Sequence, residues 1–389
     1  MASKQPSTPA REEFPETMRA LVLDTWGGPF RLEQRPVPLP GPGEALMRVR
    51  AAGVGLTLGH IRRGAFGGET PRIIGHELGG DIAAVGAGVD NVFPGDRCLV
   101  YFYLNCGSCR FCCGNRETLC VNSRGLVGVS RDGGFADYVC LPASNFLHIP
   151  DNVSYADAAV TADAVCTPWH AIKERAGVQP LDDVLILGAG GGVGIHGVQM
   201  AKLFGGRVIA VDVSPAKLDL ARTWGADEAF DARASGLAER IREATGGKGV
   251  ESCVDFAGNA QTVQLGIQSL AVAGRMVIVG VQPGAVPIDP SNLVRTEQTI
   301  TGSRHVTKLE LQETIAVVAR GLVTPVISER RPLERVEELF DLINRQELLG
   351  RAVLEVSDEA VLEGASEALD AALGPGAVRK RPHLPPEKR

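Results

Sequence analysis

The sequence lacks the features that would place it in a membrane or on a nucleic acid. Over 389 residues, no uninterrupted apolar run approaches the ~20 residues that a membrane helix needs. The formal net charge is −6, so no excess of positive charge attracts nucleic acid or an anionic membrane. Residues 1–17 are polar, contain three prolines and have no apolar stretch typical of a secretory signal. We therefore expect a disordered leader and a cytoplasmic protein.

The chain is long enough for two domains, and its two halves differ in pattern. The first half consists of short β segments between Gly- and Pro-rich turns, which predicts a barrel-like β domain. After residue 154, a helix at 155–176 is interrupted by Pro168, and strands then alternate with helices. That alternation predicts an α/β fold with a doubly wound parallel sheet. The predicted strands are 18–23, 44–52, 78–85, 97–100, 135–141, 184–187, 207–211, 252–256, 275–279 and 351–355, and the later helices are 193–203, 215–224, 260–270, 309–320 and 335–344.

Four of the nine cysteines form the pattern C-x2-C-x2-C-x7-C. They are Cys106, Cys109, Cys112 and Cys120, and Cys113 falls outside the spacing. Short loops of this kind let one segment wrap a tetrahedral Zn²⁺ with four thiolates. Disulfides and idle core thiols are the alternatives. Disulfides are disfavoured because two-residue spacings pair poorly and no secretory signal is recognised. We predict a structural zinc, which leaves no open position for chemistry.

A glycine-rich turn follows the predicted strand 184–187 and opens a helix. Its residues are Gly188, Gly190, Gly191, Gly192, Val193 and Gly194. Glycines in this context let a pyrophosphate approach the backbone N–H groups at the helix start. Asp212 ends the next strand, 18 residues beyond Gly194, where a carboxylate can reach the adenosine ribose. Its charge repels a 2′-phosphate and no cation follows at once, so NAD is favoured over NADP; Lys217 is the nearest cation that can reach the ribose.

Together these segments resemble the zinc-containing medium-chain alcohol dehydrogenase family. The segment from Gly75 to Gly80, GHELGG, with Gly86 and Val89 downstream, is similar to the family's zinc signature, and the segment 350–354, GRAVL, to its closing strand. The resemblance covers 18–356 and implies a GroES-like catalytic domain, 18–168 and 309–356, interrupted by a Rossmann NAD-binding domain, 169–308. It leaves 1–17 as the leader and 357–389 as a mostly disordered tail. It also implies that Arg351 contacts the cofactor pyrophosphate and that the protein is a homodimer or homotetramer.

The resemblance further implies a catalytic zinc in the cleft between the domains. His76 matches one ligand, Glu77 is its acidic neighbour, and Asp163 aligns with the third ligand; Cys166 is a nearby thiol whose spacing is wrong by three residues. The first ligand departs from the family, because Gly55 stands where the family has a cysteine, and Leu58 stands where it has an aspartate. Glycine has no side-chain donor, so the metal loses a strong ligand.

Two other residues match the family's proton relay, Thr57 and His60. Two outcomes therefore stay open at the cleft. Either His76, Glu77 and Asp163 hold a zinc with water, or the metal is absent and Thr57 or His60 donates directly to the developing oxyanion. We favour the second outcome.

The function that we expect is NAD-linked interconversion of an alcohol and an aldehyde or ketone by hydride transfer. Zinc-independent reduction of a conjugated C=C bond is one alternative, and a non-catalytic nucleotide-binding relative is another. The substrate is expected to be a small molecule that enters the cleft near four aromatic residues: Tyr101, Phe102, Tyr103 and Trp169.

Overall fold

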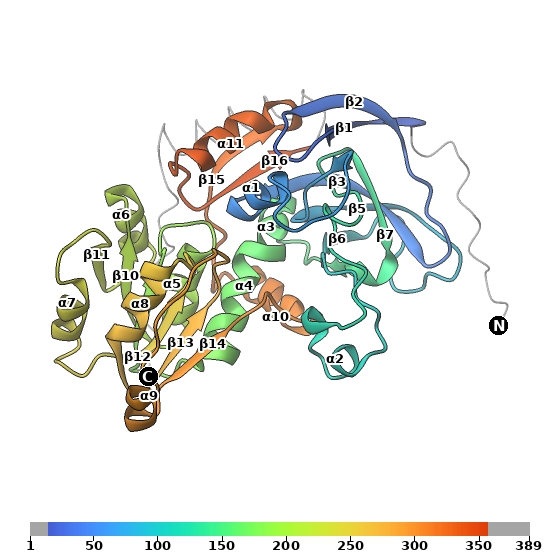
Figure 1. The fold of residues 1–389 in the computed structure, drawn as a ribbon. Helices are drawn as coiled ribbons and strands as arrows, with labels where there is room; N and C mark the ends of the chain where they lie inside the picture. Colours follow the sequence, from blue (N-terminus) through green and yellow to red (C-terminus); the bar gives the residue numbers. More distant parts are fainter. Residues whose placement is uncertain (1–14, 357–389) are drawn as a thin grey trace, which may run out of the picture.

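The computed structural model of the protein describes residues 15–356. Figure 1 shows two halves side by side, a parallel-sheet half and a β-rich half, with helices α4 (Cys166–Trp169) and α10 (Lys308–Ala319) between them. The predicted tail and most of the predicted leader lie outside the described residues. Strand β1 (Thr17–Leu23) begins at the last residue assigned to the leader. The boundaries at 168 and 308 stay a prediction.

The β-rich half contains a seven-stranded sheet and a three-stranded sheet. The path of the larger sheet is β15-β16-β3-β5-β6-β8, with β7 paired to β3, and the smaller sheet is β2-β1-β4. β16 returns from the end of the chain to pair antiparallel with β3. The bounds are β2 Phe30–Pro36, β3 Glu44–Val54, β4 Arg72–Ile73, β5 Leu78–Val85, β6 Arg97–Val100, β7 Tyr138–Pro142, β8 Phe146–His148, β15 Ile327–Pro332 and β16 Arg351–Glu355. The short helical elements of this half and its edges are α1 Leu56–Arg62, α2 Arg110–Cys113, η1 Glu117–Leu119, η2 Ala143–Asn145, η5 Leu333–Arg335 and α11 Val336–Asn344.

The second half is built on a six-stranded parallel sheet in the order β11-β10-β9-β12-β13-β14. The order reverses between β9 and β12, and in open sheets of this type ligands bind outside the carboxyl ends of the strands at that point. The predicted doubly wound α/β fold is therefore confirmed. The strands are β9 Asp183–Leu187, β10 Arg207–Asp212, β11 Glu228–Asp231, β12 Val250–Asp255, β13 Leu270–Ile278 and β14 Thr299–Gly302, and the helices are α5 Gly194–Leu203, α6 Pro215–Thr223, α7 Leu237–Ala244, α8 Ala260–Ser269 and α9 Pro290–Thr296.

A long helical segment connects the halves. It starts at α3 (Tyr155–Val160), where the Ser154 hydroxyl accepts a hydrogen bond from the Asp157 backbone N–H. The segment then passes through two π-helical stretches, η3 (Thr161–Val165) and η4 (His170–Ala176), on either side of α4. Pro168 was expected to interrupt the helix, but the helical path continues through it. π-Helical turns are rare and recur at functional sites, and Asp163 lies in the first of them.

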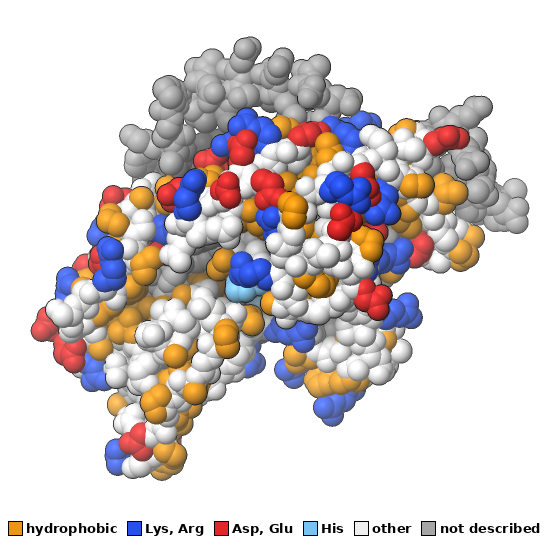
Figure 2. All heavy atoms as spheres, turned by 45° about the horizontal axis from the view of Figure 1, so that its top comes forward, with side chains coloured by type: hydrophobic (Ala, Val, Ile, Leu, Met, Phe, Trp, Pro, Cys, Tyr) orange, Lys and Arg blue, Asp and Glu red, His pale blue; other side chains and the backbone are white. Residues whose placement is uncertain are grey.

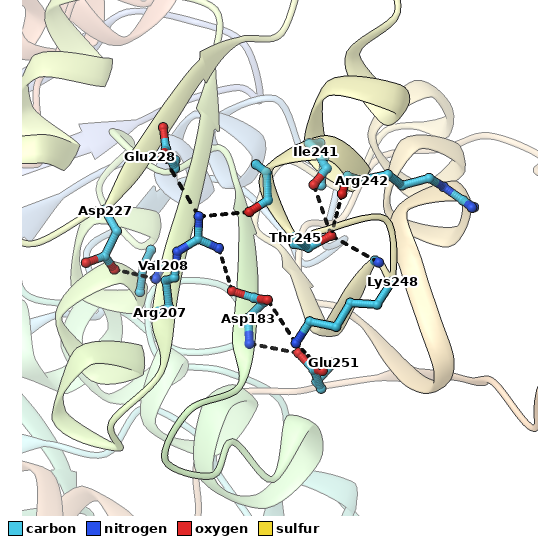
Figure 3. A network of polar contacts seen from close by, with 12 residues as sticks. Asp183, Arg207, Val208, Asp227, Glu228, Ile241, Arg242, Thr245, Lys248 and Glu251 are labelled. Atoms are coloured by element: carbon cyan, nitrogen blue, oxygen red, sulfur yellow. Dashed lines mark hydrogen bonds and ion pairs between the residues drawn. The ribbon is translucent and has the colours of Figure 1, made fainter.

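A charged network secures the amino ends of the parallel strands, opposite the edge where ligands bind (Figure 3). The Asp183 carboxylate accepts from Arg207 Nη1 at 2.7 Å and lies 3.0 Å from Lys248 Nζ. The Asp183 backbone N–H donates to Glu251 Oε2 at 2.8 Å. The Asp183 side chain is nearly buried, so Arg207 and Lys248 neutralise a carboxylate that solvent reaches poorly.

The hydrophobic cores of the two halves are continuous at one place. Ala51 of β3 and Val353 of β16 belong to the same buried cluster as Ile186 of β9 and Ile195 of α5. Residues of β3 and β16 therefore share one buried apolar cluster with residues of the parallel sheet. No helix among the described residues is long and apolar enough to span a membrane.

Candidate active site

The four cysteines predicted to bind structural zinc come together in one lobe. Their Sγ atoms are 3.5 to 3.9 Å apart in the pairs Cys106–Cys120, Cys109–Cys112, Cys106–Cys112 and Cys109–Cys120. A tetrahedral zinc with bonds of ~2.3 Å holds its sulfurs roughly 3.8 Å apart, so this lobe fits the ion. Backbone N–H groups of Ser108 and Cys109 lower the pKa of Cys106, which favours the thiolate. Cys113 is exposed and lies outside the four-sulfur group.

The glycine-rich turn lies at the carboxyl end of β9, and α5 begins at its last glycine. Gly190 is required by close packing, because a Cβ there would overlap the backbone of Lys217 on α6. Asp212 ends β10, and its carboxylate accepts from the backbone N–H groups of Gly190 at 2.9 Å and Val213 at 2.7 Å. The turn, the predicted ribose-binding acid and Lys217 are thus brought together, as a dinucleotide site requires.

His196 was not singled out from the sequence, yet it fixes the glycine-rich turn. Its Nε2 accepts from the Val326 backbone N–H at 2.9 Å, so its Nδ1 carries the proton and donates to Gly192 O at 2.8 Å. Burial lowers the pKa of His196 to about 4, which keeps the ring neutral at pH 7. A histidine in the first turn of a largely buried helix looks like an ordinary core residue, so no local pattern signals this role.

A buried polar cluster lies beside the turn, where β4, β5, η3 and β16 meet. The Arg351 guanidinium donates to both Glu77 oxygens, from Nε at 3.0 Å and from Nη2, and Nη2 also donates to Asp163 Oδ2 at 3.1 Å. Glu77 is fully buried and Arg351 is 2% exposed. Burial lowers the pKa of Arg351 to about 9, which leaves it a cation at neutral pH. The cluster joins the cofactor turn, because the Gly350 backbone N–H donates to Gly190 O at 3.4 Å.

His76 belongs to the same cluster but is not bonded within it. Its Nε2 lies 3.7 Å from Asp163 Oδ2 and 3.9 Å from Glu77 Oε1, beyond hydrogen-bond distance. Neither ring nitrogen has a hydrogen-bond partner among the described residues, although the side chain is 2% exposed. A buried imidazole without partners is costly, so a ligand or substrate atom is the expected partner.

Gly55 leaves the space that the Arg351 guanidinium fills. β16 and β3 pair Ala352 with Val54, so the same register places Arg351 opposite Gly55. A Cβ at Gly55 would overlap Arg351 Nη1 and Cζ. The Gly55 backbone is extended, with φ of −153°, so the demand for glycine comes from space and not from backbone conformation.

This arrangement does not fit a catalytic zinc. Donor atoms of His76, Glu77 and Asp163 lie within 4.8 Å of one another, close enough for an ion. Both carboxylates, however, already accept from Arg351, and the guanidinium lies against the position of the missing thiolate. A metal cation would have to displace that guanidinium and bind without any soft ligand.

His305 is a further residue that the sequence reasoning missed. It is 5% exposed, has φ of +51° and lies 3.8 Å from Asp163 through its Nε2. Its ring and that of His76 lie on Phe102, with centroids 4.4 and 4.6 Å away. Tyr101 and Tyr103 also pack on His305, so three of the four predicted pocket aromatics gather here. Because His305 lies between two predicted elements and 142 residues beyond Asp163, no spacing pattern connects them.

The other residues singled out from the sequence for the cleft are not bonded to this cluster by any contact described above. Thr57 and His60 are half-buried on α1, which begins directly after Gly55. Burial and the nearby Arg63 lower the pKa of His60.

Trp169 packs on Phe204 and donates to Glu313 at 3.0 Å, away from the other three aromatic residues. Cys166 points at His305 and is not among the clustered donor atoms, in agreement with its wrong spacing. In the space-filling view, a histidine and a cationic side chain border the hollow between the two halves (Figure 2).

Comparisons with known proteins agree with this architecture. The family described as "Alcohol dehydrogenase GroES-like domain" matches residues 41–151, and the family described as "Zinc-binding dehydrogenase" matches 192–320. An alcohol dehydrogenase of Geobacillus stearothermophilus is 35% identical over 87% of this chain and 100% of its own length. A NAD-dependent alcohol dehydrogenase of Sulfolobus acidocaldarius is 32% identical over the same shares. The crystal structure of AibC superposes with a TM-score of 0.85 at 32% identity, covering 91% of this chain and 100% of that one.

A GroES-like β half joined to a dinucleotide-type sheet and a four-thiolate lobe defines a medium-chain dehydrogenase. The chain belongs to the zinc-containing medium-chain alcohol dehydrogenase family. It is therefore an enzyme of the oxidoreductase class, and the alternative of a non-catalytic relative is not supported. NAD and a structural zinc, the two predicted cofactors, agree with this membership and with the cysteine lobe.

Proposed function

We propose that the enzyme interconverts a small alcohol and its aldehyde or ketone by hydride transfer to and from NAD. The observation that carries the proposal is the direct contact between the cofactor turn and the buried polar cluster. Gly350 bonds Gly190, and Arg351 Nη1 lies beside Gly192. A nicotinamide whose pyrophosphate rests on this turn would lie near His76 and Phe102, where a reacting carbon can meet it.

The cofactor would be held by residues of both halves. Backbone N–H groups of the turn from Gly188 to Gly194 would meet the pyrophosphate at the start of α5, and Arg351 would add positive charge there. Asp212 would accept from the ribose hydroxyls and disfavour a 2′-phosphate, and Lys217 would lie near the same ribose. NAD accepts the hydride, whereas the protein positions the substrate against the nicotinamide and polarises the substrate oxygen.

The hydroxyl proton needs a path out of a buried site. Thr57 and His60 lie on α1, which follows Gly55, and both side chains are half-buried, as a relay that leads toward solvent requires. The lowered pKa of His60 keeps its ring neutral at pH 7, so it can accept a proton passed on from the Thr57 hydroxyl. We therefore assign the proton relay to these two residues.

A second candidate is reduction of a C=C bond conjugated to a carbonyl. It is favoured by the position of Arg351 against Gly55, because a site without a metal polarises a saturated carbonyl less strongly. In this reaction hydride adds to the β-carbon, and a polar side chain protonates the α-carbon.

Parallel substrate panels separate the two reactions. Purified enzyme is assayed with NAD and a series of alcohols, and with NADH and matched pairs of saturated ketones and enones. Turnover of alcohols and saturated ketones supports the first proposal. Oxidation of NADH by enones alone replaces it with the second. We further propose that the enzyme is a homodimer or homotetramer, which sedimentation velocity would test. We also propose that it is cytoplasmic, which cell fractionation would test.

A further inference from the structure

We propose that Arg351 takes the place of the catalytic metal, and that His76 consequently acts as the hydrogen-bond donor to the substrate oxygen. This inference rests on the proposed hydride-transfer function and specifies how its oxygen is polarised. It starts from space. The guanidinium lies where the Cβ of any residue 55 other than glycine would be, so this position of Arg351 and a thiolate at residue 55 exclude each other.

Charge leads to the same conclusion. Glu77 and Asp163 are two buried carboxylates, and a buried carboxylate needs a cation or several donors. Arg351 supplies the positive charge and the hydrogen-bond donors from one side chain. Its Nε donates to Glu77, and its Nη2 donates to Glu77 and Asp163. A forked guanidinium satisfies two carboxylates in fixed directions, whereas a metal ion would need their oxygens turned toward itself. Both Glu77 oxygens and Asp163 Oδ2 are therefore already engaged by the guanidinium, whose charge would repel a metal cation beside them.

A second glycine supports the arrangement. Gly53 lies two residues before Gly55 on β3, and a Cβ there would overlap Glu77 Oε2. Residues two apart on a strand share a face. Gly53 thus makes room for the carboxylate and Gly55 for the guanidinium of one buried ion pair. Of these two glycines, only Gly55 departs from the family pattern, which has a cysteine at that position.

His76 is then free for another task. With the carboxylates occupied by Arg351, neither nitrogen of His76 has a partner among the described residues. The ring is held edge-on against Phe102 at 4.6 Å, so its direction is fixed even without hydrogen bonds. A neutral imidazole has one N–H donor, which can stabilise an oxyanion in a water-poor site. His76 is therefore a catalytic residue by direct contact with substrate and not by metal ligation.

The first test is the zinc content of the full-length enzyme after desalting, measured by plasma mass spectrometry. We expect one zinc per chain, bound by the cysteine lobe. Two zincs per chain would overturn the inference, whatever the activity. One zinc with no turnover on any substrate panel would instead sink the proposed function, so the two failures are distinguishable.

Substitution of His76 separates donor from ligand. The variant H76F should keep one zinc per chain and an unchanged Kd for NADH, while kcat falls about 100-fold or more. H76Q, whose amide can still donate, should recover part of kcat. Loss of a zinc in H76F, or a kcat within threefold of wild type, would refute the donor role.

Removal of the guanidinium tests the replacement itself. The double variant G55C/R351Q provides a thiolate and frees both carboxylates, and it should take up a second zinc or Co²⁺ ion per chain. The matched variant G59A/R351Q offers no thiolate and should take up less metal, because Gly59 lies nearby on α1 with space for a methyl group. If G55C/R351Q binds no more metal than wild type, the guanidinium is not what keeps the ion out, and the inference is wrong.

Discussion

Gly55 and Arg351 compete for one space: the glycine directly follows strand β3, and the guanidinium from the start of β16 lies where a side chain at residue 55 would be. The ion pair with Glu77 and Asp163 depends on that vacancy. The relationship connects a strand near the start of the chain with one near its end, and it changes the chemistry expected of the cleft.

Gly55→Ala should therefore destabilise the enzyme. The added methyl group overlaps the guanidinium and forces it out of a packed site, and overpacking of this kind costs about 1–3 kcal/mol. Urea unfolding followed by circular dichroism measures the change. Gly59→Ala is the control, because its new Cβ would meet no atom closer than 3.6 Å. Equal stability of the two variants would mean that Arg351 moves aside freely.

Cys112→Ser should lose the structural zinc. Removing one of four thiolates opens the site, and we expect zinc content to fall and Tm to drop by roughly 10 °C or more. Metal analysis and thermal unfolding measure both effects. Cys113→Ser is the neighbouring control: that thiol is exposed and outside the cluster, so zinc content and Tm should stay as in wild type.

Asp212→Asn should relax the preference for NAD. The amide keeps an acceptor for the Gly190 N–H but removes the charge that repels a 2′-phosphate. We expect the ratio of kcat/KM for NAD to that for NADP to fall about tenfold or more. Asp219→Asn, an exposed acid on α6, should leave the ratio unchanged. An unchanged ratio in Asp212→Asn would remove this residue from the ribose site.

His196 should make stability depend on pH. Its pKa is about 4 in the folded enzyme and 6.5 in the unfolded chain, so unfolding takes up a proton below pH 6.5. The free energy of unfolding should then be full above pH 6.5 and decrease by about 3 kcal/mol as pH falls to 4. His196→Gln retains a donor and an acceptor without titrating, so its unfolding free energy should fall less over this range. Identical pH profiles would contradict the buried, neutral ring.

Much of the fold follows from periodicity because the buried elements are strongly patterned. β9 and β10 are nearly continuous apolar runs, and the helix between them is mostly buried. The strands that sequence reasoning missed are polar or lie at sheet edges. β2 reads FRLEQRP and β15 reads ISERRP, and neither has a buried residue. β11 at the edge of the parallel sheet has four residues, none of them buried.

The candidate site was predictable where its residues are close in sequence. The cysteine lobe and the glycine-rich turn are local motifs, and their members lie together in the structure. The Arg351 cluster is not local. Arg351 is 274 positions away from Glu77 in the sequence and 188 positions away from Asp163. The sequence shows that Gly55 offers no ligand atom to a metal. Only the register of β16 on β3 shows that Arg351 fills the space beside it.

The most direct test of this account is anomalous scattering at the zinc edge from crystals of the enzyme with NADH. One peak per chain is expected, among Cys106, Cys109, Cys112 and Cys120, with Arg351 still bonded to Glu77 and no peak beside His76. A second full peak bonded to His76 Nε2, with the guanidinium turned away, would contradict the central claim.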